Sequence, residues 1–279
     1  MPNVDELQFE KDFHAPILNE LPSKEYGIMY DVEDTFWWYV GMRLNLLKLL
    51  KRYWNWNETP QPNVLDAGCG TGAILQGLSN GFGHQIPAVK PTGLDLSAEA
   101  LGFSQKRGNN FPLVKGSITN LPFTNNSFDI LISFDVLSYV KDPSPGFREI
   151  SRVVKHGGLV ILNLPAYQFL YSEHDLAVNT VKRFHKAEIA SLLSESGLKP
   201  VRMSYLNTLL FPPAAIIRLG KKGILKTRRS KEVHSDLTQP HPLVNNFLRW
   251  TMAREATILG KTNLNLPFGL SFIAVAQRI

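Results

Sequence analysis

Short apolar runs alternate with helical patterns between residues 63 and 206. Strands are expected at 63–67, 91–95, 112–116, 128–134, 157–164 and about 200–206, with one more at 270–278. Helices are expected between them, at about 72–79, 97–107, 142–155 and 185–197. Because strands that alternate with helices build parallel sheets, this order predicts an α/β core formed by residues 61–206 and 268–279.

Three residues mark the ends of the predicted helices. Ser97 precedes a helical pattern and is expected to cap it, since a serine oxygen accepts free backbone N–H groups. Pro143 is expected in the first turn of its helix, where the missing N–H costs little. Gly197 is expected at a helix C-terminus, where glycine readily takes a left-handed conformation.

Two segments lie outside the alternation. Residues 1–60 contain an aromatic cluster, "TFWWYVGMR", and an amphipathic helix, "RLNLLKLLKRYW", which together predict an N-terminal helical and aromatic lid. Residues 207–267 form an insertion before the last strand and contain several prolines and "NNFLRWTMAREATILG". Both segments are predicted to cover the ligand crevice of the central sheet, the insertion on the substrate side.

Composition indicates a globular protein of 279 residues, with 44% hydrophobic and 19% charged residues. The single cysteine, Cys69, excludes a disulfide framework, and its place among glycines suits a small packed residue. The first residues lack the apolar stretch of a signal peptide, and no run reaches the 18 or more apolar residues of a membrane span. A cytoplasmic location is therefore expected.

The basic charge is concentrated in one place. The formal net charge is +6, and Arg218–Lys231 holds seven cations and no acid, so the remainder of the chain carries a net charge of −1. A solvated loop, a site for a phosphorylated substrate and an anionic membrane surface all fit this cluster. Nucleic acid is not expected as a partner, because no aromatic residues are interleaved with the cations.

The stretch "VLDAGCGTG" at residues 64–72 is the main candidate for chemistry. Glycines after a buried strand let a backbone turn approach a ligand, and a helix N-terminus offers free N–H groups to it. The pattern Gly68, Gly70, Ala73 also fits a dinucleotide fingerprint. However, a carboxylate at Asp66 would repel a pyrophosphate and favour a cationic cofactor, whereas Asp95 is placed to accept hydrogen bonds from two ribose hydroxyls in either case.

Four stretches then occur in a familiar order. "VLDAGCGTG", "TGLDLS", "GSITNLPFTNNSFDILISFDVLSYVKDP" and "REISRVVKHGGLVILNLP" resemble the successive motifs of class I S-adenosylmethionine-dependent methyltransferases. The resemblance covers about residues 60–205 and the final strand. It implies a Rossmann-like, seven-stranded, mostly parallel sheet with helices on both faces and an antiparallel last strand. It also implies S-adenosylmethionine as cofactor and S-adenosylhomocysteine as product.

The resemblance further implies cofactor contacts at the ends of the strands. In chain order these are Gly68 and Gly70 at the methionine moiety, Asp95 at the ribose, Leu96 on the adenine, Ser117 and Ile118 at the adenine edge, Phe134 and Asp135 beneath the sulfonium through their backbone, and Val136 and Tyr139 close by. The family often has an acidic residue in place of Ser117, and often histidines where this chain has Ser138 and Tyr139.

Three further side chains are candidates for the site. His174, in "YSEHD" just after the fifth strand, is a candidate general base, because histidine titrates near neutrality; helix capping or a buried structural hydrogen bond is the alternative. Trp38, within the cluster Phe36–Tyr39, either presents an aromatic face to the sulfonium or an apolar substrate, or anchors the N-terminal helix. Arg43 is placed to pair with the cofactor's carboxylate. No metal site is predicted.

Together these features predict methyl transfer to a small molecule by in-line displacement, with oxygen favoured over nitrogen or carbon as the acceptor atom. The insertion combines apolar runs with cations and so suits an amphipathic, lipid-linked or peptide-derived acceptor. Peripheral membrane contact through Arg218–Lys231 is a further possibility. The alternative is a protein of the same fold that binds the cofactor without transferring a methyl group.

Overall fold

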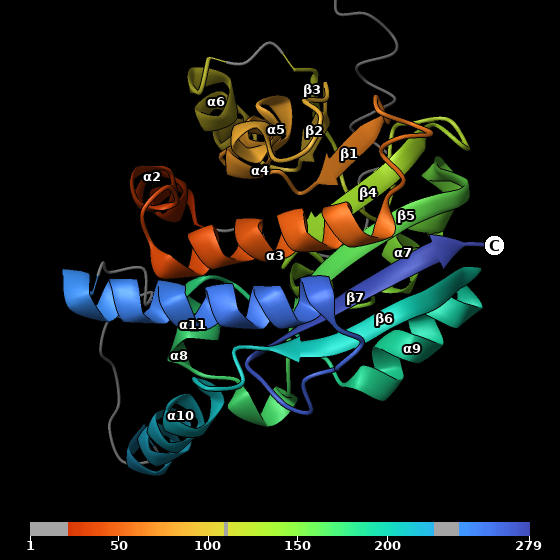
Figure 1. Cartoon of the computed structure of the whole chain (residues 1–279). Coiled ribbons are helices and arrows are strands. Elements are labelled where there is room, and N and C mark those ends of the chain that lie inside the picture. The colour runs from red at the N-terminus through yellow and green to blue at the C-terminus, as the bar shows by residue number, and fades with distance from the viewer. Residues whose placement is uncertain (1–21, 109–110, 226–239) are drawn as a thin grey trace, which may run out of the picture.

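The computed structural model describes residues 22–108, 111–225 and 240–279. Within them, a seven-stranded sheet runs through the centre in the order β3-β2-β1-β4-β5-β7-β6 (Figure 1). Its strands are β1 (Val64–Ala67), β2 (Thr92–Asp95), β3 (Leu113–Lys115), β4 (Phe128–Phe134), β5 (Val154–Pro165), β6 (Leu198–Leu206) and β7 (Ser271–Arg278). β7 is antiparallel to β5 and β6, and the other pairs are parallel. The predicted mostly parallel sheet with an antiparallel last strand is confirmed.

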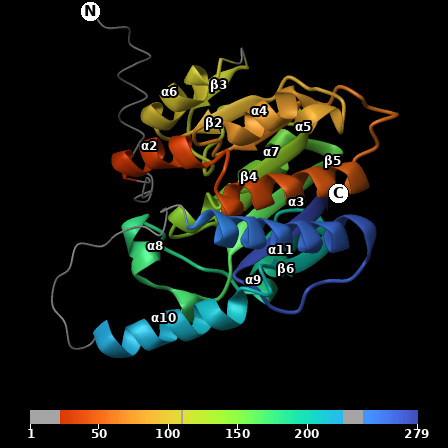
Figure 2. The same ribbon diagram turned by 60° about the vertical axis from the view of Figure 1, so that its left-hand side comes forward.

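Helices cover both faces of this sheet, as predicted (Figure 2). They are α2 (Ser23–Val32), α3 (Trp37–Tyr53), α4 (Ala73–Ser79), α5 (Gly81–His84), α6 (Ala98–Lys106), α7 (Ser144–Val153), α8 (Glu173–Ala177), α9 (Lys186–Glu195), α10 (Phe211–Leu225) and α11 (Pro242–Lys261). Two single 3₁₀ turns, η1 (Leu137–Tyr139) and η2 (Gln168–Leu170), complete the described elements.

The centre of the sheet is buried on both faces because β4, β5 and β7 contain apolar runs at 130–132, 159–162 and 272–276. Alternate side chains point to opposite faces, so Ile130 and Ile132 of β4 join one core with α3 and α11. Leu131, between them, joins the other core with Phe147 of α7 and Ile189 of α9. One strand thus serves two apolar layers at once.

Two predicted boundaries are wrong around α7. Pro143 lies at the N-cap rather than inside the first turn, which Pro145 occupies instead. The helix then ends at Val153, and β5 begins directly at Val154, three residues before the predicted strand. Val154 takes extended backbone angles and pairs with Phe128, so the β-branched valines continue into the sheet rather than prolonging the helix.

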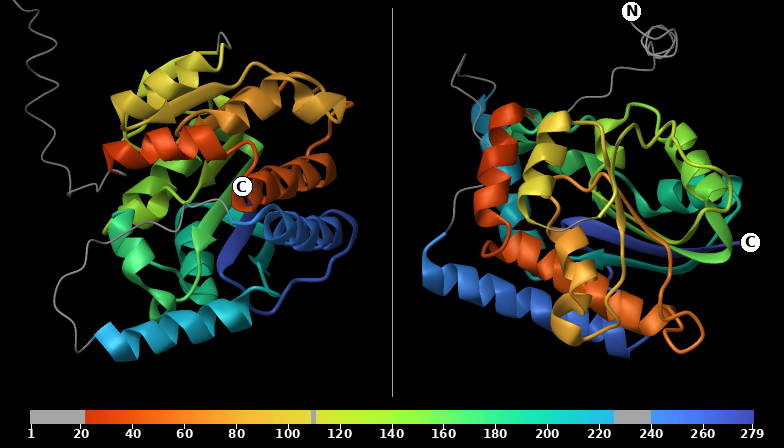
Figure 3. Two further views of the ribbon diagram at one scale, coloured as in Figure 1. Left: turned by 90° about the vertical axis from the view of Figure 1, so that its left-hand side faces the viewer. Right: turned by 90° about the horizontal axis from the view of Figure 1, so that it is seen from above.

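The N-terminal segment and the insertion form one layer. α3 and α11 lie side by side and run in the same direction over one face of the sheet (Figures 1 and 3). Asn245 links their N-terminal ends, because its side chain accepts from the Trp37 N–H at 2.9 Å and donates to the Thr35 carbonyl at 2.9 Å. At the other end, Arg52 donates to the carbonyl oxygen of Thr262 at 2.6 Å.

The basic cluster is only partly described. Arg218 lies on α10, whereas Lys226, Arg228, Arg229 and Lys231 lie outside the described residues. Among the described helices, none is long and apolar enough to cross a membrane.

Gly41 lets α3 and α11 approach closely, because a Cβ there would overlap the side chain of Met252. We expect Gly41→Val to lower the free energy of unfolding by about 1–3 kcal/mol through overpacking. Urea unfolding followed by circular dichroism measures this. Gly27→Ala on α2 is the matched control, because its new methyl group meets only Phe103 at 3.8 Å. A Gly41→Val variant as stable as that control would contradict close packing of the two helices.

Candidate active site

A cavity of about 1110 Å³ lies at the carboxyl ends of the parallel strands. Its walls include the turns that follow β1, β2 and β4, the end of β5, and residues of α2, α3, α8 and α10. Figures 2 and 3 show these helices grouped on one side of the molecule, together with the N-terminal end of α11. Loops at this edge of a parallel sheet converge, so residues distant in sequence meet here.

The glycine loop forms one wall of the cavity. Gly68 and Gly72 have φ angles of 91° and 89°, which side chains rarely adopt, and a Cβ at Gly68 would overlap Val136. The N–H groups of Gly68 and Cys69 both donate to the Leu94 carbonyl, at 2.6 and 2.9 Å. The turn is therefore held at the end of β2.

Asp95 connects the glycine loop to the turn that follows β2. Its carboxylate accepts from the Gly70 N–H at 2.8 Å and from the Ser97 N–H at 2.9 Å. Ser97 in turn accepts from the Ala100 N–H, which confirms the predicted cap of α6. Asp95 also lines the cavity, so its carboxylate lies within reach of a ligand that enters it.

The predicted adenine-side residues also line the cavity. Leu96, Ser117 and Ile118 all lie on its wall. The Ser117 hydroxyl bonds to the Thr119 hydroxyl at 2.7 Å and accepts from the Thr119 N–H at 3.1 Å. These two hydrogen bonds within the turn therefore fix the orientation of the Ser117 hydroxyl.

Asp66 is the exception among the predicted contacts. It does not line the cavity: it is 1% exposed, and its Oδ2 has no hydrogen-bond partner among the described residues. Burial, followed by the charges of Asp95 and Glu33, raises the pKa of Asp66 to about 8. The expectation that this carboxylate points into the site is therefore corrected, because the chain turns at Gly68 and leaves Asp66 beneath the loop.

The opposite side of the cavity carries the groups suited to proton transfer. Phe134, Asp135, Val136 and Tyr139 line it, as predicted. Asp135 has a φ of 62°, uncommon for a side-chain-bearing residue, and accepts from the Asn163 amide at 2.8 Å. Burial raises the pKa of Asp135 to about 7, although the Asn163 hydrogen bond and the Arg183 charge oppose that shift. The sequence pointed to its backbone and missed this side chain.

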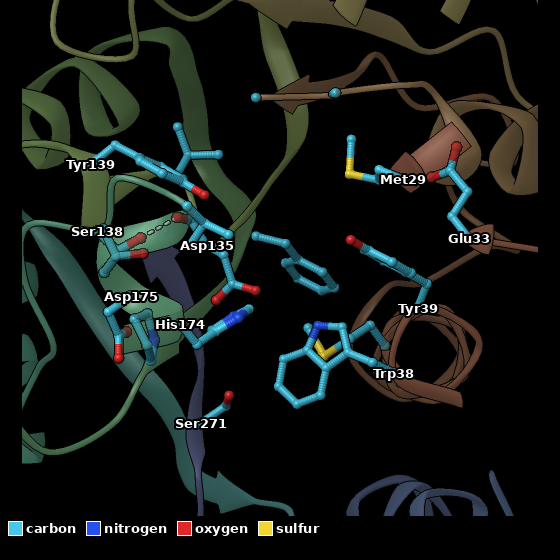
Figure 4. A pocket seen from close by; sticks show the side chains of 18 of the residues that line it. Met29, Glu33, Trp38, Tyr39, Asp135, Ser138, Tyr139, His174, Asp175 and Ser271 are labelled. Carbon is cyan, nitrogen blue, oxygen red and sulfur yellow. Dashed lines mark hydrogen bonds between the residues drawn. The ribbon is translucent and has the colours of Figure 1, made fainter. Parts of the chain in front are cut away.

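His174 projects into the same part of the cavity. Figure 4 shows its imidazole beside Asp135, with Trp38 and Tyr39 opposite. Helix capping is not its role, because the capping box of α8 uses Ser172 and Asp175.

A buried ion pair supports α8. The Arg183 Nε donates to Asp175 at 2.8 Å, with both side chains at most 5% exposed. The same guanidinium donates to the Ala166 carbonyl at 3.1 Å, at the end of β5. His174, which adjoins Asp175 on this short helix, is thereby held on a fixed support.

Trp38 and Arg43, the two residues predicted to reach the site from the N-terminal segment, both line the cavity. Trp38 lines the cavity and also packs against the core formed by α3, α11 and the sheet, so it is both an anchor and a wall. Arg43 lines the cavity as well, but it donates to the Glu33 carbonyl at 2.8 Å and lies 3.7 Å from Asp34. In the structure it therefore braces the lid.

Sequence reasoning missed a polar cluster that ties α2 to the glycine loop. The buried Glu33 carboxylate accepts from the Thr71 hydroxyl and forms an ion pair with Arg107. Arg107 also donates to the Thr71 carbonyl at 2.8 Å and to the Gln76 side chain at 2.8 Å. These groups are up to 74 positions apart in the chain, and no local pattern connects them.

Comparison with known proteins agrees with this geometry. Residues 65–162 match a family described as a methyltransferase domain. Over 139 residues the chain is 32% identical to an uncharacterized methyltransferase of Schizosaccharomyces pombe, covering 44% of this chain and 48% of that protein. Over 165 residues it is 26% identical to a demethylmenaquinone methyltransferase of Chlorobaculum tepidum, covering 50% and 66%. The chain thus spans about half to two thirds of the length of these curated relatives.

Among solved structures, the cyclase SpnF has a TM-score of 0.52 with 16% identity, over 85% of this chain and 80% of that one. A likeness at this identity concerns the fold. The domain match, the strand order and the glycine loop together define the class of this region: residues 65–162 are a methyltransferase domain, set in a sheet with the fold of the class I S-adenosylmethionine-dependent methyltransferases.

The residues present fit this cofactor. A Cβ at Gly68 would overlap Val136, so the turn on this wall of the cavity requires glycine, and Asp95 lies on the same wall. Glu33, Asp95 and Asp135 line the cavity and Asp66 lies beneath it, so buried acidic groups surround a space that suits a ligand with cationic groups.

The buried Asp66 makes stability depend on pH. In the unfolded chain its carboxyl ionises near pH 4, whereas in the folded chain the pKa is about 8. Stability is therefore lost as the pH rises through this window, and Asp66→Asn, which cannot ionise, avoids the loss. We expect the stability of Asp66→Asn relative to wild type to increase from pH 5 to pH 8 in urea unfolding. A difference independent of pH would contradict the raised pKa.

Proposed function

We propose that this protein transfers the methyl group of S-adenosylmethionine to a polar atom of an amphipathic small molecule, with an oxygen acceptor favoured. The observation that carries the proposal is the pairing of Asp135 and His174 in one part of an otherwise largely apolar cavity. The Chlorobaculum relative, whose name specifies demethylmenaquinone, supports an acceptor with a ring head and an apolar tail. A carbon or nitrogen acceptor is the alternative chemistry.

In this proposal the glycine loop and Asp95 hold the cofactor. When bound, S-adenosylmethionine supplies a methyl group on a positively charged sulfur, which is already activated for displacement. Asp95 would accept hydrogen bonds from the two ribose hydroxyls. The backbone at Gly68 and Gly70 would border the methionine moiety. Leu96, Ser117 and Ile118 would border the adenine. Positioning of this kind is worth up to about 7–11 kcal/mol when the geometry is ideal.

The acceptor would enter between α3, α8 and α10. Trp37, Pro213, Ile217 and Leu248 line this part of the cavity and suit an apolar group. Trp38 and Tyr39 face the proton-accepting pair and would exclude water from it. Because burial raises the pKa of Tyr39, its phenol stays protonated and acts as a hydrogen-bond donor.

His174 or Asp135 would accept the proton that an acceptor hydroxyl loses. Histidine ordinarily titrates near neutrality, and burial brings the pKa of Asp135 to about 7 as well. A base whose pKa lies near the working pH is the effective kind.

The alternative proposal is a protein that binds the cofactor without transferring its methyl group. The reason to consider this alternative is the cyclase SpnF, a protein that has this fold and is named for a different reaction. Tight cofactor binding, together with no label transfer to any extracted lipid or aromatic acceptor, would support this alternative.

The first test is calorimetric titration with S-adenosylmethionine and S-adenosylhomocysteine. We expect Asp95→Ala to weaken binding at least about tenfold, since a hydrogen bond to a charged group contributes about 1.5–3 kcal/mol. Asp129→Ala is the control, because Asp129 pairs with Lys155 at the opposite end of β4 and is remote from the cavity. Absence of binding by the folded wild-type protein would contradict the proposed function.

The second test follows label from methyl-labelled S-adenosylmethionine into extracted lipids and hydroxylated aromatic compounds. We expect His174→Asn or Asp135→Asn to slow transfer to oxygen by about 10²–10⁴-fold, the usual contribution of a general base. The cofactor affinity of His174→Asn should stay at the wild-type value, because His174 is not among the predicted cofactor contacts. Full activity in both variants would show that the acceptor needs no base from this pair, and mass spectrometry of the product would identify the acceptor atom.

A further inference from the structure

α11 is apolar on its outer side as well as on its packed side. Met252, Ala256 and Leu259 are buried on the inner side. On the outer side, Leu243, Phe247 and Trp250 are 74%, 59% and 52% exposed. Their spacing of four and three residues places these three side chains on one helix face. A helix of a soluble protein normally presents polar residues there, so this stripe is unpartnered within the described residues.

Neighbouring elements extend the apolar surface. Ile216 and Ile217 of α10 are 72% and 58% exposed, and Leu176 of α8 is 56% exposed. Ile217 and Leu248 also line the cavity, so apolar surface continues from the cavity interior onto α10 and α11. In Figure 2 and in the left view of Figure 3, α8, α10 and the start of α11 lie on the same side of the molecule.

The described surface charges of α10 and α11 are all positive. Arg249 and Arg254 are exposed, and the Arg254 guanidinium lies 5.2 Å from the centre of the Trp250 ring. The sequence of α10 has no acid. The acid of α11, Glu255, is buried, where it accepts the Asn207 and Thr208 N–H groups at 2.6 and 2.9 Å.

We propose that the α10–α11 surface binds a lipid bilayer that carries anionic headgroups. This surface is defined here as Ile216, Ile217, Leu243, Phe247, Trp250, Arg249 and Arg254. Leucine and aromatic side chains beside arginine suit the boundary between acyl chains and headgroups. A second copy of the chain fits less well, because pairing α11 with itself would bring Arg249 and Arg254 near their own copies.

Docking would place the cavity beside the bilayer. An acceptor with an apolar tail would then insert its head past Ile217 and Leu248 while its tail stays among the lipids. This consequence for delivery rests on the proposed function, whereas docking itself requires no methyl transfer.

Co-sedimentation with phosphatidylcholine vesicles, with and without phosphatidylglycerol, tests the proposal on the full chain. We expect binding to the anionic vesicles that weakens as salt rises. Phe247→Ser with Trp250→Ser should lower the partition coefficient at least about tenfold, and Arg249→Gln with Arg254→Gln by about fivefold for each charge removed. Val201→Ser with Leu264→Ser is the matched control, because both side chains are exposed elsewhere.

Thermal unfolding should be unchanged in all these exposed variants, so a loss of vesicle binding will not reflect misfolding. Equal binding by wild type and the Phe247/Trp250 variant, or no binding at low salt, would overturn the proposal. So would a dimer in light scattering that the same variant makes monomeric, since the stripe would then join two copies. Cofactor affinity measured in parallel separates the cases: vesicle binding without cofactor binding would refute the proposed function and leave docking standing.

Discussion

The contacts of the Arg107 guanidinium with Glu33 and Thr71 are the interactions that hold the wall of the cavity together. The Arg107 side chain is 4% exposed and meets the Glu33 carboxylate of the lid and the Thr71 carbonyl of the glycine loop. Removing one partner of a buried ion pair typically costs about 3–5 kcal/mol, because the other charge is left uncompensated. The lid, the loop and the helix that carries Arg107 therefore hold together as one unit, and the cavity keeps its wall only while that unit is intact.

The acids around the cavity oppose the stability of the folded chain. Asp66 and Asp135 are buried with raised pKa values, and Asp66 also feels the charges of Asp95 and Glu33. Such an arrangement is unfavourable in an empty site and is relieved by a ligand that brings positive charge. Of these two acids only Asp135 lines the cavity, so ligand binding and stability would be coupled through Asp135.

Local patterns, together with the resemblance to a known family, predicted the fold and most of the loops that line the cavity. The strands, the glycine turn and Asp95 follow from short stretches whose backbone requirements are visible in sequence. His174 was also found, because it follows a strand end. Three features were beyond reach: the Glu33–Arg107 contact, which joins distant segments; the burial of Asp66, which depends on a turn geometry; and the Asp135 side chain, which reaches the cavity through a left-handed backbone angle.

The order of strands has a consequence for how the chain is made. β7 lies between β5 and β6, and β6 at the sheet edge pairs with no other strand of the described residues. α11 likewise pairs with α3 across more than 200 positions. During synthesis, the N-terminal helices and the first strands emerge long before the pieces that cover and complete them. A nascent chain must therefore keep broad apolar faces from associating wrongly until β7 has left the ribosome.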